Sequence, residues 1–373
     1  MMAGRLAAQL VGLPADNLST MNRLAATVAA LTLFAACSAD SASTTSQTDP
    51  TSTTSPASGV ALAAYSLEAG TSFTYEVDIE QDITMNVEGD TSTIGEEDFP
   101  GDSEINLTGS ATFTQTVSDG PRPGTFEVRV VGEFTDLTVT GTVDGEPVDE
   151  VPEFAELSPI NSTFVVNEKG RIVGSDTGLE DPLGGLLDPG AFDPASMPGP
   201  DPGRFLGPEL PDSEVGVGDS WETASEFPGL GADPVVVDSS STVTGTDDIE
   251  GVEVLVIETS TSTSRIEVDF GELLLGMFGA LTPEDMEPEE AEEYDELLEG
   301  LKFLIFIDDA ISDATNWVDP VAGVVWQSQS ASSTSMGIDV SVPDQETGEL
   351  IEATVNMALR QDITYRLTEG SSA

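Results

Sequence analysis

Residues 73–79 read FTYEVDI, a stretch in which apolar and polar side chains alternate strictly. Because successive side chains of an extended strand point to opposite faces, this alternation predicts an antiparallel strand with one buried and one solvated face. We therefore predict a mainly β fold (β-rich α+β) built on a curved antiparallel sheet or half-barrel. Further runs rich in Val, Thr, Ile and Phe, bounded by Gly, Asp or Pro, occupy residues 105–117, 126–140, 164–173, 234–246, 251–270, 316–328, 335–342 and 351–367.

The predicted strands fall into two similar halves, residues 60–180 and 212–370. Between them, residues 181–211 contain eight prolines and six glycines, a density that no regular element survives, and we interpret this segment as a crossover. The similarity between the halves rests on three pairs of segments: Gly70–Phe73 with Gly218–Trp221, Phe126–Phe134 with Val252–Ser260, and Asn167–Ile172 with Asp319–Val324.

One segment of the second half, residues 271–312, is predicted to be a helical insertion. Thr282 followed by Pro283 and two acidic residues is typical of a helix start, and Tyr294, Leu298 and Leu301 lie on one apolar stripe. The pattern fits either a cap on the sheet or a lid over an apolar cavity, and it leaves both open. The candidate residues for an apolar ligand site are Leu273, Leu274, Met277, Phe278, Tyr294, Leu298 and Phe303.

The N-terminal region predicts export and lipidation. A short basic segment at 21–23 precedes an apolar run over 24–34, which ends Ala35-Ala36-Cys37. Two small residues before a lone cysteine resemble a bacterial lipobox, although Phe34 stands where Leu is more usual. We expect a signal peptide over 1–36, with Met21 as an alternative start, and lipidation of Cys37; an ordinary secretory signal is the other interpretation.

Residues 38–59 follow this cysteine and contain 13 Ser or Thr in 22 positions, with no aromatic residue. Such a composition cannot bury enough surface to offset the entropy of ordering, so we expect residues 37–59 to be a disordered tether. Acyl chains on Cys37 would anchor the folded part at the outer face of the cell membrane.

Composition excludes several classes of function. With 69 acidic residues against 11 basic ones, the chain has a net charge of -58, which repels nucleic acid. It has no His and one Cys, so it can form no His-dependent catalytic triad, imidazole metal site, intramolecular disulfide or Cys-based cluster. We expect an acidic surface adapted to salt, as in a halophile, with a divalent-cation binder as the alternative.

Short motifs that resemble parts of catalytic sites lack the other residues that catalysis needs. Gly218-Asp219-Ser220 resembles an esterase nucleophile block without the His base, and Asp176-Thr177-Gly178 resembles one of the two loops that an aspartic protease needs. The acidic clusters at 96–104 and 247–250 lack the EF-hand spacing. We therefore expect no enzyme, no cofactor and no dedicated metal site.

The start of the second half carries a resemblance to a family. Pro211, Val215, Val217 and Gly218-Asp219-Ser220-Trp221, followed by the Gly323 turn, are similar to a motif of an uncharacterised actinobacterial lipoprotein family with two related β halves. More distantly, the arrangement resembles LolA/LppX-type lipoprotein carriers, in which a curved sheet wraps a helix and an apolar cavity. The resemblance implies a non-enzymatic envelope lipoprotein that holds an apolar ligand.

Two functions therefore remain open from the sequence. The first is a membrane-anchored lipoprotein, exposed on the extracellular face, that binds a lipid or another apolar molecule between sheet and helix. The second is a structural or adhesive envelope protein with a filled core and no ligand. The partners expected are the membrane, through the N-terminal lipid, and an apolar small molecule; the oligomeric state does not follow from the sequence.

Overall fold

The computed structural model describes residues 46–47, 60–65, 67–89, 102–143, 145–147, 160–176, 207–227, 235–269, 302–343 and 350–371. The regular structure of these residues is β-strand, which confirms the prediction of a mainly β fold. The strands are β1 (Ser46–Gln47), β2 (Ala61–Leu62), β3 (Ser72–Gly89), β4 (Ser103–Asp119), β5 (Thr125–Val143), β6 (Glu146–Pro147), β7 (Ile160–Asn167), β8 (Ile172–Asp176), β9 (Val215–Gly216), β10 (Ser220–Phe227), β11 (Val235–Ile249), β12 (Val252–Thr263), β13 (Ile266–Asp269), β14 (Lys302–Asp319), β15 (Val324–Pro343) and β16 (Leu350–Ser371).

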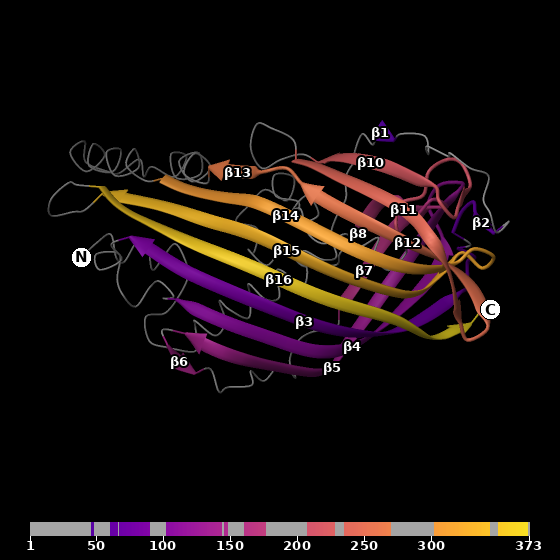
Figure 1. The fold of residues 1–373 in the computed structure, drawn as a ribbon, viewed down its shortest axis with the longest axis horizontal. Helices are drawn as coiled ribbons and strands as arrows, with labels where there is room; N and C mark the ends of the chain where they lie inside the picture. The colour runs from indigo at the N-terminus through magenta and orange to yellow at the C-terminus, as the bar shows by residue number, and fades with distance from the viewer. Residues whose placement is uncertain are drawn as a thin grey trace, which may run out of the picture.

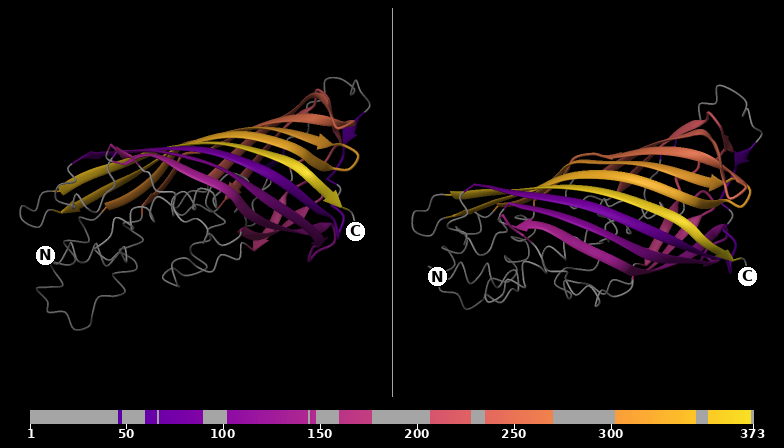
Figure 2. Two further views of the ribbon diagram at one scale, coloured as in Figure 1. Left: turned by 90° about the horizontal axis from the view of Figure 1, so that it is seen from below. Right: turned by 60° about the horizontal axis from the view of Figure 1, so that its bottom comes forward.

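Fourteen of these strands form one antiparallel sheet in the order β1-β10-β11-β12-β14-β15-β16-β3-β4-β5-β7-β8, with β13 beside β14 and β6 beside β5. The two outermost strands do not pair with each other, so the sheet stays open. Figures 1 and 2 show that the sheet is long and curved, with β14, β15, β16, β3 and β4 running along its length, and we call its concave side the trough. The predicted curved antiparallel sheet is therefore present.

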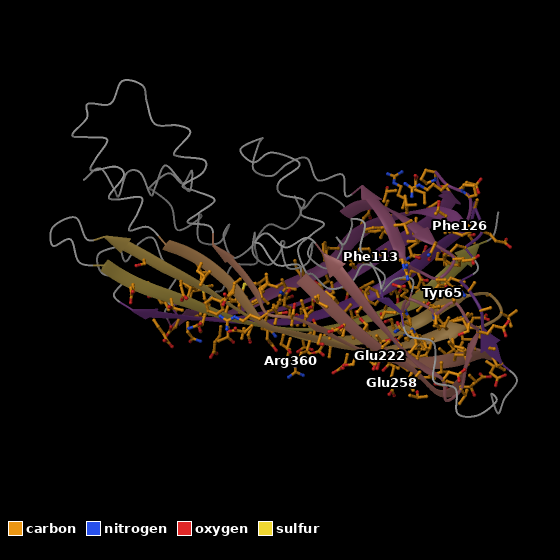
Figure 3. The ribbon with its side chains drawn as sticks, turned by 90° about the horizontal axis from the view of Figure 1, so that it is seen from above. Tyr65, Phe113, Phe126, Glu222, Glu258 and Arg360 are labelled. Carbon is orange, nitrogen blue, oxygen red and sulfur yellow. The ribbon has the colours of Figure 1, made fainter. Side chains whose placement is uncertain are left out.

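Alternation along each strand separates the inner from the outer face of the trough. In the FTYEVDI stretch of β3, Phe73, Tyr75, Val77 and Ile79 are buried, whereas Glu76 and Asp78 are exposed. In Figure 3, Glu258 and Arg360 project from the outer side of the sheet, away from Tyr65, which lies between its walls. Because successive side chains point to opposite faces of a strand, the alternating sequence places its apolar residues together on the inner face, where they are buried.

The apolar core is densest at one end, which we call the plugged end. There the short strands β2 and β9 form a separate two-stranded sheet, and their buried side chains include Leu62 and Val215. This small sheet packs with Leu210, Trp221 and Val318 in the same core cluster. The opposite end, which we call the distal end, is where β3 ends at Gly89 and β4 begins at Ser103 (Figure 1).

Corresponding turns in the two parts of the chain have the same hydrogen bonds. The N–H of Gly70 donates to the carbonyl of Val117 in β4, as that of Gly218 does to Val243 in β11. Both glycines have positive φ, 92° and 95°. Likewise, the side chain of Asn167 caps the β7–β8 turn, and that of Asp319 caps the β14–β15 turn, each by accepting two backbone N–H bonds.

The helical insertion predicted over 271–312 is wrong for its last part, because residues 302–312 belong to β14. The reason is that Phe303–Ile307 is an unbroken apolar run, which periodicity alone cannot assign to helix or strand. Residues 271–301 lie outside the described residues, as do the signal peptide and Cys37. No helix in the described ranges is long and apolar enough to span a bilayer. Within the predicted tether, Ser46–Gln47 form β1 and pair with β10.

Candidate ligand-binding trough

The inner face of the central strands is uncharged, although the chain carries a net charge of -58. Charged residues of these strands occupy the alternate, outward positions, as Glu80 and Asp82 do on β3. A surface kept free of charge is suited to contact apolar material. The inner positions are the odd residues 255–263 of β12, the even residues 310–316 of β14 and 328–338 of β15, and the odd residues 353–367 of β16, 73–87 of β3 and 103–117 of β4.

A row of methionines crosses the inner face towards the distal end. Met336 of β15 lies opposite Met357 of β16, which in turn lies opposite Met85 of β3. Ile307 of β14 extends the row on one side. Met336, Met85 and Ile307 are only half-buried. Unbranched thioether side chains adapt to irregular apolar shapes, so this methionine row is a surface that can accept acyl chains of varied form.

Closer to the plugged end, hydroxyl and amide side chains replace the apolar ones on β11 to β3. Two cross-strand pairs of hydroxyls are bonded to each other, Ser239 to Thr261 and Ser241 to Thr259, each at 3.0 Å. We call this set the polar belt. Its members are Ser239, Ser241, Thr259, Thr261, Ser312, Asn316, Ser328, Ser330, Ser332, Gln361 and Gln81.

Asn316, Ser328 and Gln361 of the polar belt, which are 3%, 0% and 2% exposed, each bury a polar atom that has no hydrogen-bond partner among the described residues. The atoms are Oδ1 of Asn316, Oγ of Ser328 and Nε2 of Gln361. Asn316 and Ser328 lie directly opposite each other on β14 and β15. Buried polar groups in proteins are nearly always bonded, so these atoms mark a place where a partner is missing.

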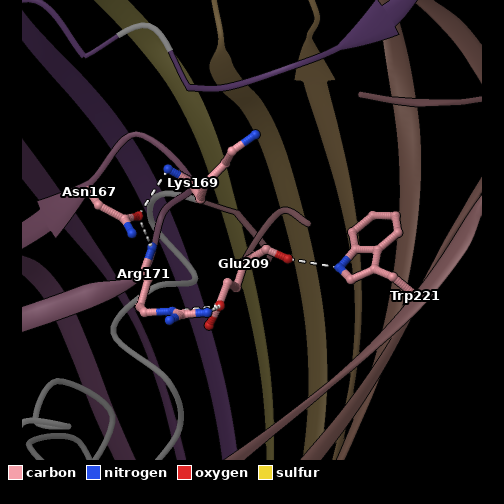
Figure 4. Close-up of polar contacts among 5 residues, drawn as sticks. All are labelled: Asn167, Lys169, Arg171, Glu209 and Trp221. Carbon is pink, nitrogen blue, oxygen red and sulfur yellow. Dashed lines mark hydrogen bonds and ion pairs between the residues drawn. The ribbon is translucent and has the colours of Figure 1, made fainter. Parts of the chain in front are cut away.

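At the plugged end, by contrast, one group of polar side chains is paired (Figure 4). Nε of Arg171 donates to Oε1 of Glu209 at 2.7 Å, and the two side chains form an ion pair. The indole Nε1 of Trp221 donates to the carbonyl of Glu209 at 2.8 Å. The N–H groups of Lys169 and Arg171 donate to Oδ1 of Asn167. We call these five residues the clasp; they join the β7–β8 turn, the crossover and the start of β10.

Two tyrosines close the interior behind the clasp. The phenol of Tyr65 donates to the carbonyl of Pro208 at 2.7 Å, and its ring lies against Gly170 and Gly207. The phenol of Tyr75 donates to the carbonyl of Val325 at 3.2 Å. Burial disfavours the charged phenolate, so it raises the pKa of Tyr75 well above its usual value.

The outer face carries an acidic hollow across the middle of the sheet. Glu258, Asp313 and Asp362 line it, together with Thr315 and Thr364. In the part of the chain that the structure describes, no group of three or more acidic or cysteine side chains is arranged to hold a metal ion. The carboxylates of the hollow are therefore solvated, and they are not arranged to coordinate a metal ion.

Most of the predicted site residues lie outside the described residues: Cys37, Leu273, Leu274, Met277, Phe278, Tyr294 and Leu298. Phe303 lies in β14, where its backbone pairs with Val340 of β15. The sequence prediction missed the polar belt and the methionine row. The signal was present, because Gln361 interrupts an apolar phase of β16 that includes Leu359 and Ile363, and Gln81 does the same in β3.

The comparisons place the chain in no known family. No family pattern matches the sequence, and no curated protein matches it. Among solved structures, lipovitellin, in a structure titled for its lipid–protein interactions, has a TM-score of 0.35 and 10% identity over 82% of this chain and 26% of its own. The chain thus spans about a quarter of lipovitellin.

Two bacterial proteins show weaker similarity. The hypothetical lipoprotein YmcC of Escherichia coli has a TM-score of 0.19 and 10% identity, covering 74% of this chain and 85% of its own. An outer membrane channel of Pseudomonas putida F1 has a TM-score of 0.17 and 8% identity, covering 84% of this chain and all of its own. The trough itself is therefore the basis on which a function can be proposed.

Proposed function

We propose that this chain is a non-enzymatic lipoprotein, held at the extracellular face of the cell membrane through lipidated Cys37, whose trough binds a lipid or another apolar ligand. The observation that carries the proposal is the uncharged inner face with its half-buried methionine row, in a chain of net charge -58. Moving a charged group out of water costs free energy, so a surface that contacts apolar material is kept free of charge. A half-buried apolar row of this kind is typical of such a surface.

We also propose that residues 60–180 and 212–370 are related halves. The matching hydrogen bonds at Gly70 and Gly218, and the matching side-chain caps of Asn167 and Asp319, support this. Repetition of one meander gives a sheet wide enough to curve into a trough, which a single short meander does not.

Native mass spectrometry of the full chain, expressed in a lipid-rich bacterial host as the Cys37→Ser variant, tests the ligand. We expect a lipid-sized adduct. Met336→Glu should remove the adduct, because it places a charge in the methionine row, whereas Ser335→Glu on the exposed outer face should keep it. Met336→Gln adds polarity without charge and is the control for misfolding. If it keeps the adduct, the loss of the adduct in Met336→Glu is caused by the charge. A folded protein with no adduct in any form would favour the structural envelope role.

The anchor has its own test. Cys37→Ser should move the protein from the membrane fraction to the medium, because two or three acyl chains are needed for a durable anchor and the variant carries none. Ser38→Ala, next to it, is the matched control and should stay with the membrane. If the Cys37→Ser protein remains in the membrane fraction, the anchor proposal is wrong, whatever the trough binds.

A further inference from the structure

We infer that the ligand is an uncharged amphiphile, with a hydroxyl-bearing head group on the polar belt and its apolar chain along the methionine row. The inference rests on the proposed function and deepens it by naming the chemistry of the ligand. Three independent features lead to it: unpartnered buried polar atoms, the hydrogen-bonding types of those atoms, and the position of the belt beside the methionine row.

The unpartnered atoms indicate that the head group is polar. Asn316, Ser328 and Gln361 are each at least 97% buried, yet one polar atom of each finds no partner among the residues that the structure describes. Leaving such an atom unpaired costs about 1–3 kcal/mol, so a fold keeps several of them together only where something else supplies the bonds. A purely hydrocarbon ligand would leave all three costs in place.

The types of these atoms favour a neutral head group over an anionic one. Oδ1 of Asn316 is an acceptor, Nε2 of Gln361 is a donor, and Oγ of Ser328 is both. A hydroxyl donates and accepts, so a head group with two or more hydroxyls can satisfy all three. A carboxylate or ionised phosphate only accepts, and it would meet both Oδ1 of Asn316 and the field of a chain with a net charge of -58.

The spacing of the polar belt indicates a head group larger than one hydroxyl. Ser328 and Ser332 lie on the same inner face of β15, four residues apart, and Ser332 lies opposite Gln361. At about 3.3 Å per residue, the two rows are roughly 13 Å apart, with the row of Ser330 between them. A disaccharide reaches across such a distance, whereas a single alcohol or a glycerol does not.

The belt and the methionine row are close enough for one molecule. On β16, Gln361 is followed on the same face by Leu359 and then Met357, four residues away. The distance along the strand is again roughly 13 Å. An acyl chain that starts at Gln361 therefore reaches Met357 after roughly 13 Å, while the head group remains on the polar belt.

Displacement of N-phenyl-1-naphthylamine from the delipidated full chain tests the inference with three ligands that share one acyl chain: sucrose monooleate, methyl oleate and oleate. We expect sucrose monooleate to displace the probe at a concentration at least tenfold lower than methyl oleate, which corresponds to about 1.4 kcal/mol. Gln361→Leu and Ser328→Ala should each narrow this gap to threefold or less, with methyl oleate unchanged. The exposed outward residues Gln329 and Ser333 provide the controls, Gln329→Leu and Ser333→Ala, which should leave the gap intact.

Each other outcome overturns a separate claim. If sucrose monooleate binds no better than methyl oleate, the head-group inference is wrong, while the proposed function stands. If oleate binds as tightly as sucrose monooleate at low salt, where its repulsion is least screened, the ligand need not be uncharged and the inference is again wrong. If no ligand displaces the probe and the probe itself does not bind, the proposed function fails as well.

Discussion

The clasp at the plugged end and the polar belt in the trough are both buried polar regions, but they are built in opposite ways. In the clasp, Arg171, Glu209 and Trp221 satisfy one another across three segments of the chain. In the belt, Asn316 and Gln361 each keep an atom that has no partner among the described residues. This contrast underlies our proposal that the clasp serves the fold and that the belt serves a ligand.

The largest expected effect is in the clasp. Trp221→Ala should lower the free energy of unfolding by about 4 kcal/mol, because it removes a large buried side chain and a hydrogen bond that holds the crossover. Trp317 provides the matched control: it is half-exposed, its indole bonds to exposed Asp247, and Trp317→Ala should cost about 1 kcal/mol. Urea denaturation at fixed salt measures both. Equal losses would show that the clasp contributes no more to the free energy of unfolding than the outer face does.

The packing of Tyr65 behind the clasp can be isolated with a pair of glycines. Gly170 and Gly124 have nearly the same φ, 81° and 80°, so replacement by Ala strains both backbones by about 1 kcal/mol. At Gly170 the new Cβ would lie 2.8 Å from the ring of Tyr65, whereas at Gly124 it meets nothing within 4 Å. We expect Gly170→Ala to lower the melting temperature by about twice as much as Gly124→Ala. A similar decrease for both would mean that Tyr65 moves aside freely.

The sequence predicts the strands and their faces well because that information is local. The FTYEVDI alternation specifies which side chains of β3 are buried, and the burial of Phe73 and Ile79 confirms it. In β14 the same reasoning fails, because an apolar residue also lies on the outer face there. Phe306 lies on the outer face over Gly337, and the guanidinium of Arg265 lies over its ring, so apolar residues occupy consecutive positions.

The polar belt could be predicted only in part, because it depends on register. A polar residue such as Gln361 in an apolar phase is visible in the sequence, but its alignment with Ser332 and Gln81 is set by pairing between strands far apart in the chain. The clasp is harder still, since Arg171 and Glu209 are joined by a turn and a crossover that have no periodic pattern. Local propensity can be read from the sequence, whereas pairing between distant segments cannot.

The polar belt should respond to substitution in the opposite direction from the clasp. Gln361→Leu replaces an unpartnered buried amide by an apolar side chain of similar size, so it should raise the free energy of unfolding of the ligand-free protein by about 1 kcal/mol. Gln329→Leu, at an exposed outward position of β15, should change it by less than about 0.5 kcal/mol. Urea denaturation of delipidated protein gives both values. Destabilisation by Gln361→Leu would mean that this amide serves the fold, as the clasp does.

The smallest expected effect changes with pH, and it concerns Tyr75, a buried polar group that the fold does satisfy. At pH 7, Tyr75→Phe should cost about 1 kcal/mol, because the hydrogen bond to the carbonyl of Val325 is lost. Burial raises the pKa of Tyr75, so above about pH 10 the unfolded chain releases this proton while the folded chain keeps it. The unfolded state then binds fewer protons, and the wild type loses about 1.4 kcal/mol per pH unit that the variant does not lose. The two stabilities, measured by urea denaturation from pH 7 to 11, should therefore converge near pH 11; a constant difference would show that the phenol is accessible to water in the folded protein.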